Sequence, residues 1–302
     1  MTPAARLLAW FDRNGRDLPW RDTRDPYRIL VSEMMLQQTQ VSRVLVFYRR
    51  WLERFPDWQT LAKADNATVI RAWSGLGYNR RALMLRDIAR QIVGNPPAPK
   101  YQLPGTEAEW LELKGVGPYT SAALAAFSLH ERTMPVDTNV RRVLGRLLLG
   151  IPFPSPKQDD RIKKAADEFL PERGRYYDVP QALFDLATVV CKKTPNCAVC
   201  PMRSLCPAAP KFLSGKVRVP KRSVAKTNES RHRNKLHPDR IYRGRILKLA
   251  GRPGGFPLAR LGEAIDPGYD GALDRAWIAA MVSRLVADKL ARLSRGRVSL
   301  PR

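Results

Sequence analysis

Cysteine and histidine are both scarce in this chain of 302 residues. The four cysteines, Cys191, Cys197, Cys200 and Cys206, all fall within residues 191–206, and there are three histidines. A secreted chain more often has cysteine pairs distributed along its length, so this usage favours a reducing compartment. Four thiols in one short window are typical of a zinc or iron–sulfur site.

Long apolar runs are also missing. No stretch is long enough to span a bilayer, and the first 20 residues contain acidic and aromatic residues where a signal peptide needs an uninterrupted apolar core. We therefore expect a cytoplasmic protein without membrane contacts.

Acidic residues are too few to balance the basic ones. The chain has 53 Lys and Arg against 28 Asp and Glu, a formal net charge of +25. Residues 207–302 hold 22 of the basic residues but only 7 of the acidic ones. This excess favours a polyanionic partner, most commonly nucleic acid; an arginine-rich genome composition is the alternative explanation.

Strand patterns are rare, and helical periodicity dominates. Amphipathic segments joined by Pro and Gly turns predict helices over residues 3–14, 26–38, 40–55, 66–73, 79–93, 107–113, 118–130, 137–149, 158–170 and 178–190. The fold class is therefore all-α. Residues 209–238 are rich in Pro, Ser, Lys and Arg, which predicts a flexible basic linker.

Residues 239–302 form a separate module. Its pattern predicts helices over 240–250, 258–265 and 273–290, followed by a basic hairpin over 292–300 that turns at Gly296. This order is the outline of a winged-helix-like module, which could place its third helix in a DNA major groove. A helical cap that packs on the rest of the protein is the alternative.

A glycine pair marks the first segment with chemical content. Gly115 and Gly117 flank one apolar residue, and a predicted helix opens directly after them with Pro118 and Tyr119. Such a turn exposes backbone amides beside the positive end of a helix, where a phosphate oxygen can bind. Taken alone, the turn could also be no more than a tight connection.

Together, the glycine turn, the downstream Asp137 and the cysteine window resemble the helix-hairpin-helix DNA glycosylase superfamily. The segments 32–40 (SEMMLQQTQ), 18–21 (LPWR) and 75–78 (GLGY) are most similar to its MutY branch, the A/G-mismatch adenine glycosylases. The resemblance covers residues 3–208. It implies an iron–sulfur cluster domain built from residues 1–26 and 137–208, and a six-helix barrel domain with the helix-hairpin-helix motif over 27–136.

The reaction of this superfamily needs two carboxyl groups. Cleavage of an N-glycosidic bond requires a proton on the departing base and a negative charge beside the sugar, which becomes an oxocarbenium ion. The resemblance implies that Glu33 protonates the base, that Asp137 stabilises the sugar cation, and that Asn139 holds the Asp137 carboxylate. A helix-surface carboxylate at Glu33 and a plain helix cap at Asp137 are the structural alternatives.

Tyr119 bears on the type of glycosylase. Members of the superfamily that also nick the strand have a lysine just after the hairpin, where its amine forms a Schiff base with the sugar. An aromatic residue at this position therefore implies a monofunctional enzyme. Packing at the start of the helix is the alternative role.

Further residues match positions that contact DNA and the extruded base. The resemblance implies that Gln38 and Tyr78 fill the vacated base stack and that Thr39 and Leu76 lie beside the opposing base. It places the adenine pocket at Trp20, Arg21 and Gln181. Trp20 and Tyr78 could instead be core aromatics.

The resemblance assigns a 4Fe-4S cluster, rather than zinc, to Cys191, Cys197, Cys200 and Cys206. Basic residues lie in the same loop, and they are Lys192, Lys193 and Arg203. Contacts between these side chains and DNA phosphates would add to the salt dependence of binding.

The expected function is that of a base excision repair glycosylase, acting as a monomer on double-stranded DNA with a mismatched or damaged base and located in the nucleoid. The base removed is expected to be adenine opposite guanine or 8-oxoguanine. Residues 207–302 lack the β-rich pattern of the domain that inspects 8-oxoguanine in MutY enzymes. The alternatives are a thymine or uracil glycosylase acting on G mismatches and a non-catalytic lesion-binding protein.

Overall fold

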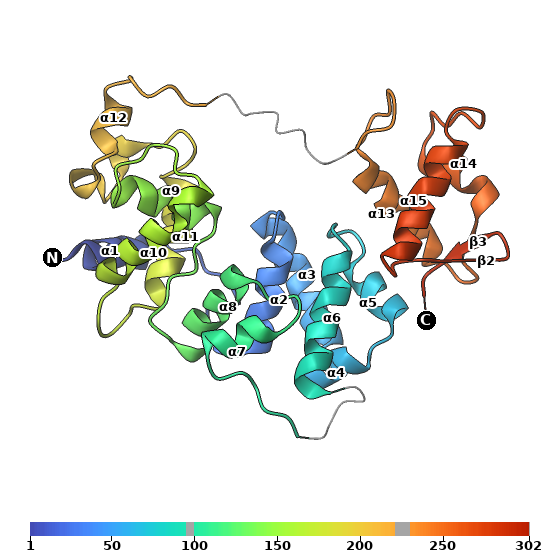
Figure 1. Ribbon diagram of the computed structural model, residues 1–302, viewed down its shortest axis with the longest axis horizontal. Helices are drawn as coiled ribbons and strands as arrows, with labels where there is room; N and C mark the ends of the chain where they lie inside the picture. The colour runs from blue at the N-terminus through green and yellow to red at the C-terminus, as the bar shows by residue number, and fades with distance from the viewer. Residues whose placement is uncertain (95–99, 221–229, 302) are drawn as a thin grey trace. The chain divides into compact units, whose positions relative to one another are not determined.

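Helices provide most of the regular structure in this computed structural model, which describes residues 1–94, 100–220 and 230–301 (Figure 1). The chain divides into two compact units. Unit 1 comprises Met1–Ile29 and Pro104–Ser223, and unit 2 comprises Leu30–Leu103 and Val224–Arg302. None of the described helices is both long enough and apolar enough to cross a membrane.

Unit 1 combines the N-terminal helix with the middle third of the chain. Its helices are α1 (Pro3–Asn14), α7 (Glu107–Glu112), α8 (Pro118–Leu124), α9 (Thr138–Leu147), α10 (Asp159–Phe169), α11 (Asp178–Val189) and α12 (Ala209–Leu213), with short 3₁₀ turns at Pro156–Gln158, Cys197–Val199 and Arg203–Leu205. Helix α11 packs against both α1 and α9, and α10 packs against α9. The core between them includes Leu7, Trp10, Val140, Leu144 and Leu183.

Helix α8 changes its geometry halfway along the segment predicted as one helix. From Ala125 to Leu129 it continues as a π-helix, and His130 ends it in the left-handed backbone conformation, with φ of 54°. Both features are uncommon, and π-helical turns often mark functional positions.

Unit 2 contains four of the helices in the segment 27–136, which the resemblance assigns to a barrel domain. These are α3 (Val41–Arg54), α4 (Trp58–Lys63), α5 (Asn66–Trp73) and α6 (Arg80–Val93), and α2 (Pro26–Leu36) spans the boundary between the units. Trp51 and Trp73 meet edge to face in the core, with ring centroids 5.3 Å apart at 86°. Aromatic pairs of this geometry add to the stabilisation from burial.

The C-terminal part of unit 2 contains the three predicted helices and the predicted hairpin in order, together with one short strand, β1 (Phe256–Pro257), that was not predicted. It contains α13 (Asp239–Ala250), β1 (Phe256–Pro257), a 3₁₀ turn (Leu258–Arg260), α14 (Leu261–Ile265), α15 (Arg275–Ala287), β2 (Arg292–Ser294) and β3 (Arg297–Ser299). The strands form an antiparallel sheet in the order β1-β3-β2. Arg295 and Gly296, with φ of 49° and 66°, make the two-residue turn predicted at Gly296.

Most helix predictions are confirmed to within one or two residues. The helix predicted over 273–290 ends three residues early, at Ala287, and the one predicted over 258–265 begins as a 3₁₀ turn. Helix α4 was not predicted, because its six residues are too few to show periodicity, although Asp57 caps it and Trp58 and Leu61 are buried. Within the predicted linker 209–238, the first residues form α12 instead, and residues 221–229 lie outside the described residues. The domain boundaries expected from the resemblance stay predictions.

Candidate active site

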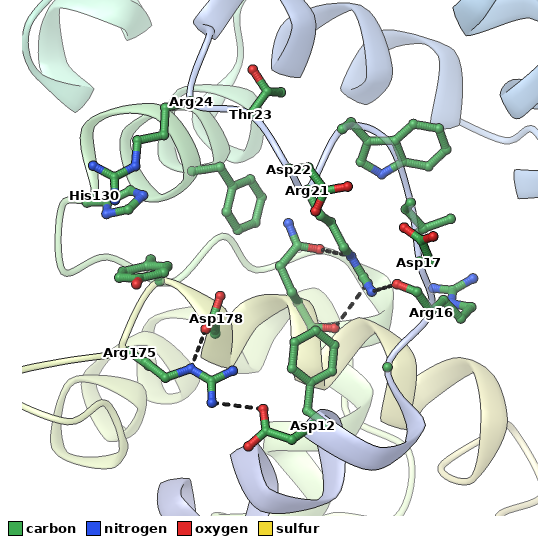
Figure 2. Close-up of a pocket in the computed structure, with 17 residues that line it drawn as sticks. Asp12, Arg16, Asp17, Arg21, Asp22, Thr23, Arg24, His130, Arg175 and Asp178 are labelled. Carbon is green, nitrogen blue, oxygen red and sulfur yellow. Dashed lines mark hydrogen bonds and ion pairs between the residues drawn. The ribbon is translucent and has the colours of Figure 1, made fainter.

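Unit 1 contains a pocket of about 500 Å³ (Figure 2). Its lining comes from the segment 11–24, from the end of the π-helix and from the start of α11. Trp20, Arg21 and Gln181 all line it. The three residues predicted to bind the base therefore come together, although a long stretch of sequence separates Gln181 from the other two.

Arg21 is fixed in this pocket by hydrogen bonds. Its Nε donates to Gln181 Oε1 at 2.9 Å, and each terminal nitrogen donates to one oxygen of Asp185 at 2.9 Å. Asp185 is fully buried and also accepts from the backbone amide and the Nε of Arg16, at 2.8 and 2.7 Å. Bidentate hydrogen bonds between a guanidinium and a carboxylate are strong and directional, so Asp185 fixes the orientation of Arg21. Arg21 in turn orients Gln181 through its Nε.

Asp185 was not predicted as a functional residue. Burial raises its pKa, but hydrogen bonds from Arg21 and Arg16 outweigh burial and hold the pKa below its ordinary value of 3.8. Asp185 lies one helical turn after Gln181 on α11, and this spacing was the signal in the sequence that could have identified it.

His130 and Tyr177 form another part of the pocket lining. Their rings stack with centroids 3.9 Å apart and planes 20° from parallel. Burial and the positive charge of Arg24 lower the pKa of His130, although Asp178 opposes them, so the imidazole is neutral at neutral pH. Flat rings beside fixed hydrogen-bonding groups suit a planar heteroaromatic ligand. No motif in the sequence indicates this pair.

An ion-pair bridge closes one edge of the pocket. Figure 2 shows Arg175 between Asp12 and Asp178, with separations of 2.8 and 2.6 Å. The bridge joins α1 to the start of α11, so both elements that border the pocket are held to one guanidinium.

Asp137 is held at the start of α9. One carboxylate oxygen accepts from the amides of Asn139 and Val140 at 2.8 and 2.7 Å, and the other accepts from Asn139 Nδ2 at 2.8 Å. The side chain therefore caps the helix, as the structural alternative stated, and it is also oriented by Asn139. These donors leave lone-pair positions on the carboxylate for a further partner.

Hydrogen bonds continue from Asn139 toward the cysteines. Arg142 donates to Asn139 Oδ1 at 3.1 Å and to the backbone oxygens of Cys191 and Ala187 at 2.8 and 3.0 Å. The start of α9 and the end of α11 are thus joined through one guanidinium.

The four cysteines line one small pocket together with Arg146. Arg146, almost fully buried, donates to the sulfur of Cys191 at 3.4 Å and to the backbone oxygens of Lys192 and Lys193 at 2.6 and 3.0 Å. Lys192, Lys193 and Arg203 are themselves exposed.

No disulfide forms among the cysteines, and burial raises the pKa of the Cys200 thiol to about 11. Any metal group bound here must therefore displace thiol protons. Among the described residues, no group of three or more His, Cys, Asp or Glu side chains is arranged so that it could hold a single metal ion.

The glycine turn lies between α7 and α8, as predicted. Gly115 has φ of 104°, which is the left-handed region that favours glycine, and Val116 is buried beneath the turn. Gly117 is the N-cap of α8 and Pro118 is its first residue. Tyr119 lies in the first turn of α8, next to the exposed turn.

Glu33 lies in α2 within unit 2. Its exposed fraction is 7%, and its neighbours Met34 and Met35 are buried. It is therefore not a helix-surface carboxylate, which removes one of the structural alternatives.

The residues predicted to enter or face the duplex lie in two short loops of unit 2. Gln38 and Thr39 follow α2, and Leu76 and Tyr78 lie between α5 and α6. Gln38 is exposed, and Tyr78 has an exposed fraction of 43%, so Tyr78 is not a core aromatic. Leu76 is buried and packs within unit 2.

Tyr78 also lines a second pocket, of about 320 Å³, with basic residues that include Arg43 and Lys248.

Residues 31–172 match the family described as HhH-GPD superfamily base excision DNA repair protein. The adenine DNA glycosylase of Mycobacterium tuberculosis is 36% identical over 304 residues, which cover 98% of this chain and 92% of that protein. The adenine DNA glycosylase of Mus musculus is 38% identical over 225 residues, which cover 70% of this chain and 43% of that protein.

Two solved structures are similar to this chain over about 70% of its length. A thermostable thymine-DNA glycosylase has a TM-score of 0.62 and 27% identity, covering 69% of this chain and 95% of the other. A trapped endonuclease III–DNA covalent intermediate has a TM-score of 0.58 and 18% identity, covering 70% and 95%. The second likeness shows a shared fold.

Replacing Asp185 by Asn should destabilise the protein by about 3 kcal/mol, because Arg21 would lose its buried partner. The ionised Asp185 carboxylate stabilises the folded protein fully at pH values above the ordinary carboxyl pKa. This stabilisation is lost as the pH falls through the lowered pKa of Asp185 in the folded protein. The unfolding free energy of the wild type should therefore fall more steeply below pH ~4 than that of Asp185→Asn.

Urea unfolding at several pH values measures both quantities. Asp178→Asn is the matched control on α11, since its partner Arg175 is substantially exposed and the pair contributes at most about 1 kcal/mol. Equal losses in the two variants would contradict the role of Asp185.

Proposed function

Because the chain belongs to the HhH-GPD superfamily of base excision DNA repair proteins, we propose that it is a DNA glycosylase that removes adenine from a mispair. The observation that carries the proposal is the unit 1 pocket, where Trp20, Arg21 and Gln181 meet. The identity to adenine DNA glycosylases along nearly the whole chain supports adenine as the base.

The pocket has the groups that adenine recognition needs. The purine would stack on an aromatic ring and form hydrogen bonds with Gln181, whose side-chain oxygen Arg21 holds in place. Because Asp185 holds Arg21 and Arg21 holds Gln181, these groups are in place before the base arrives. Such preorganisation lowers the entropic cost of binding.

Two carboxyl groups carry the chemistry in this proposal. Glu33, buried in α2, donates a proton to the departing adenine, so that the base leaves neutral. Asp137, oriented by Asn139, faces the sugar and stabilises its oxocarbenium character. Water then attacks the sugar and gives one proton to Glu33, which restores the carboxyl group, and an abasic site remains.

Tyr119 makes the enzyme monofunctional in this proposal, since a phenol at the start of α8 cannot form a Schiff base with the sugar. The turn at Gly115 and Gly117 would bind a backbone phosphate through its amides. Gln38 and Tyr78 would fill the space that the extruded adenine leaves. Thr39 and Leu76 would lie near the opposing base, which we propose to be guanine or 8-oxoguanine.

The cysteine pocket fits an iron–sulfur group by the chemistry of its donors. Cys191, Cys197, Cys200 and Cys206 would hold a 4Fe-4S cluster, which cross-links the loop 191–206 when it is bound. Arg146 holds the same loop through two backbone oxygens, and the exposed Lys192, Lys193 and Arg203 would contact phosphates.

The C-terminal module is proposed to be a winged-helix DNA-binding element. The order of α13, β1, α14, α15, β2 and β3, with the sheet order β1-β3-β2, is typical of that fold. Its hairpin is exposed from Arg292 to Arg297 and carries three arginines and no acidic residue. The Mycobacterium tuberculosis relative matches the chain through this module, whereas the Mus musculus relative covers 70% of the chain.

A panel of duplexes tests the proposed reaction. Single-turnover assays on A:8-oxoG, A:G, T:G and U:G pairs, followed by alkaline cleavage, should show abasic sites where adenine was mispaired. Glu33→Gln should bind these duplexes as the wild type does but release base at least about 100-fold more slowly. Cleavage of T:G alone would instead favour a thymine glycosylase, the activity named for the similar solved structure.

Loss of one cysteine ligand should remove the cluster. Cys200→Ser should lower both the iron content and the visible absorbance of the purified protein, and should destabilise the loop 191–206. Val199→Ala is the control, because Val199 is an exposed neighbour that lies outside the cysteine pocket. Zinc without iron in the purified wild type would contradict the cluster.

The basic hairpin can be tested by charge removal. Arg292→Ser with Arg295→Ser should weaken duplex binding and should reduce the slope of log affinity against log salt by about 1 for each phosphate that the variant no longer binds. Lys163→Ser with Lys164→Ser removes the same charge from the exposed face of α10 and serves as the control. An unchanged salt slope in the hairpin variant would assign the module to another partner.

A further inference from the structure

The two loops that carry the proposed DNA wedges both contain a strained residue. Gln38, after α2, and Tyr78, between α5 and α6, have φ of 54° and 49°. This left-handed conformation costs a non-glycine residue roughly 1–3 kcal/mol and persists only where neighbouring contacts enforce it. Something in unit 2 must therefore hold both loops.

One side chain, Arg81 in the first turn of α6, contacts both loops. It is 7% exposed. On the α2 side, its Nη1 donates to the backbone oxygens of Met34 and Gln37 at 2.7 and 2.6 Å, and its Nη2 donates to Thr39 Oγ1 at 3.3 Å. Arg81 thereby satisfies carbonyls in the last turn of α2, where a helix leaves oxygens without amide partners.

On the other side, Arg81 binds the loop that carries Tyr78. Its Nη2 donates to the backbone oxygen of Gly77 at 3.1 Å, and its guanidinium lies 5.3 Å from the Tyr78 ring centroid and 5.4 Å from that of Trp73. Trp73 Nε1 donates to the same Gly77 oxygen at 3.0 Å. The Tyr78 loop is therefore fixed through its backbone and through its aromatic ring.

The chemistry of arginine suits this position. Its planar fork offers several donors in fixed directions, whereas a lysine ammonium is one compact point of charge that cannot span two loops. Burial lowers the pKa of Arg81 to about 10, although Tyr78 raises it, so the guanidinium keeps its charge at neutral pH. The guanidinium bonds to carbonyl and hydroxyl oxygens and lies against aromatic rings, so its donors are directed at the two loops.

We propose that Arg81 is a positioning residue that joins the Gln38–Thr39 turn and the Leu76–Tyr78 loop into one rigid wedge for base extrusion. The proposal rests on the proposed function, because it assumes that these loops enter the duplex. Two side chains that replace an extruded base must enter the stack with a fixed separation. A shared guanidinium sets that separation before DNA binds, so the loops insert together.

The conservative variant Arg81→Lys tests the proposal. It keeps the charge but loses the fork, so the loops should move independently. With a fluorescent adenine analogue at the target position, Arg81→Lys should show less extrusion, and single-turnover base release should slow by about 10- to 100-fold. Affinity for a fully paired duplex, which does not require insertion, should stay within about twofold of the wild type.

Arg86→Lys is the matched control. Arg86 is also a buried arginine of α6, but it bonds to Asp87 and Asn66 and contacts neither wedge loop. Arg86→Lys should lower the thermal stability about as much as Arg81→Lys does, but it should not reduce base extrusion. Equal loss of extrusion in both variants, or normal extrusion in Arg81→Lys, would overturn the proposal.

A double-mutant cycle separates coupling from stability. If Arg81 joins the loops, the effects of Gln38→Ala and Tyr78→Ala on extrusion should be non-additive in the wild type and additive in Arg81→Lys. Additivity in both backgrounds would refute the shared wedge. Failure of the proposed function can be distinguished from failure of the role proposed for Arg81, because in the first case the wild type itself would extrude no mispaired base.

Discussion

The buried carboxylate of Asp185 is the interaction on which the unit 1 pocket depends. It anchors Arg16 and Arg21, and Arg21 in turn orients Gln181. Because a buried charge without a partner is costly, these groups are stable only as a set. The N-terminal segment is thus fixed to α11, and this connection gives the pocket its hydrogen-bonding side.

Arginine recurs as the residue that holds functional segments in place. Arg81 holds the two loops of unit 2, Arg142 joins Asn139 to the end of α11, and Arg146 holds the cysteine loop. Arg81 and Arg146 are buried and Arg142 is partly buried, and all three bond mainly to backbone oxygens. The large positive charge therefore serves two purposes, because part of it stabilises the interior and the remainder, such as the exposed hairpin, is available to a polyanion.

Much of this arrangement could be predicted from the sequence, and the reasons for success and failure are physical. Helix ends marked by Pro, Gly and capping Asp residues were predicted closely. Motif similarity indicated Trp20, Arg21 and Gln181, and these three residues line one pocket. Asp185, His130 and Arg81 were missed because their roles arise from contacts between distant segments. The π-helix at 125–129 and the left-handed Gln38 and Tyr78 are likewise imposed by packing and have no local signature.

The pairing of the first helix with α11 has a consequence for the order of folding during synthesis. Arg21 and Asp185 are 164 positions apart. At the ribosomal rate, the segment around Arg21 waits on the order of ten to thirty seconds before its partner is made. All of residues 30–103 are synthesised in that interval, so the segment around Arg21 cannot form its native ion pair until this whole stretch has been made.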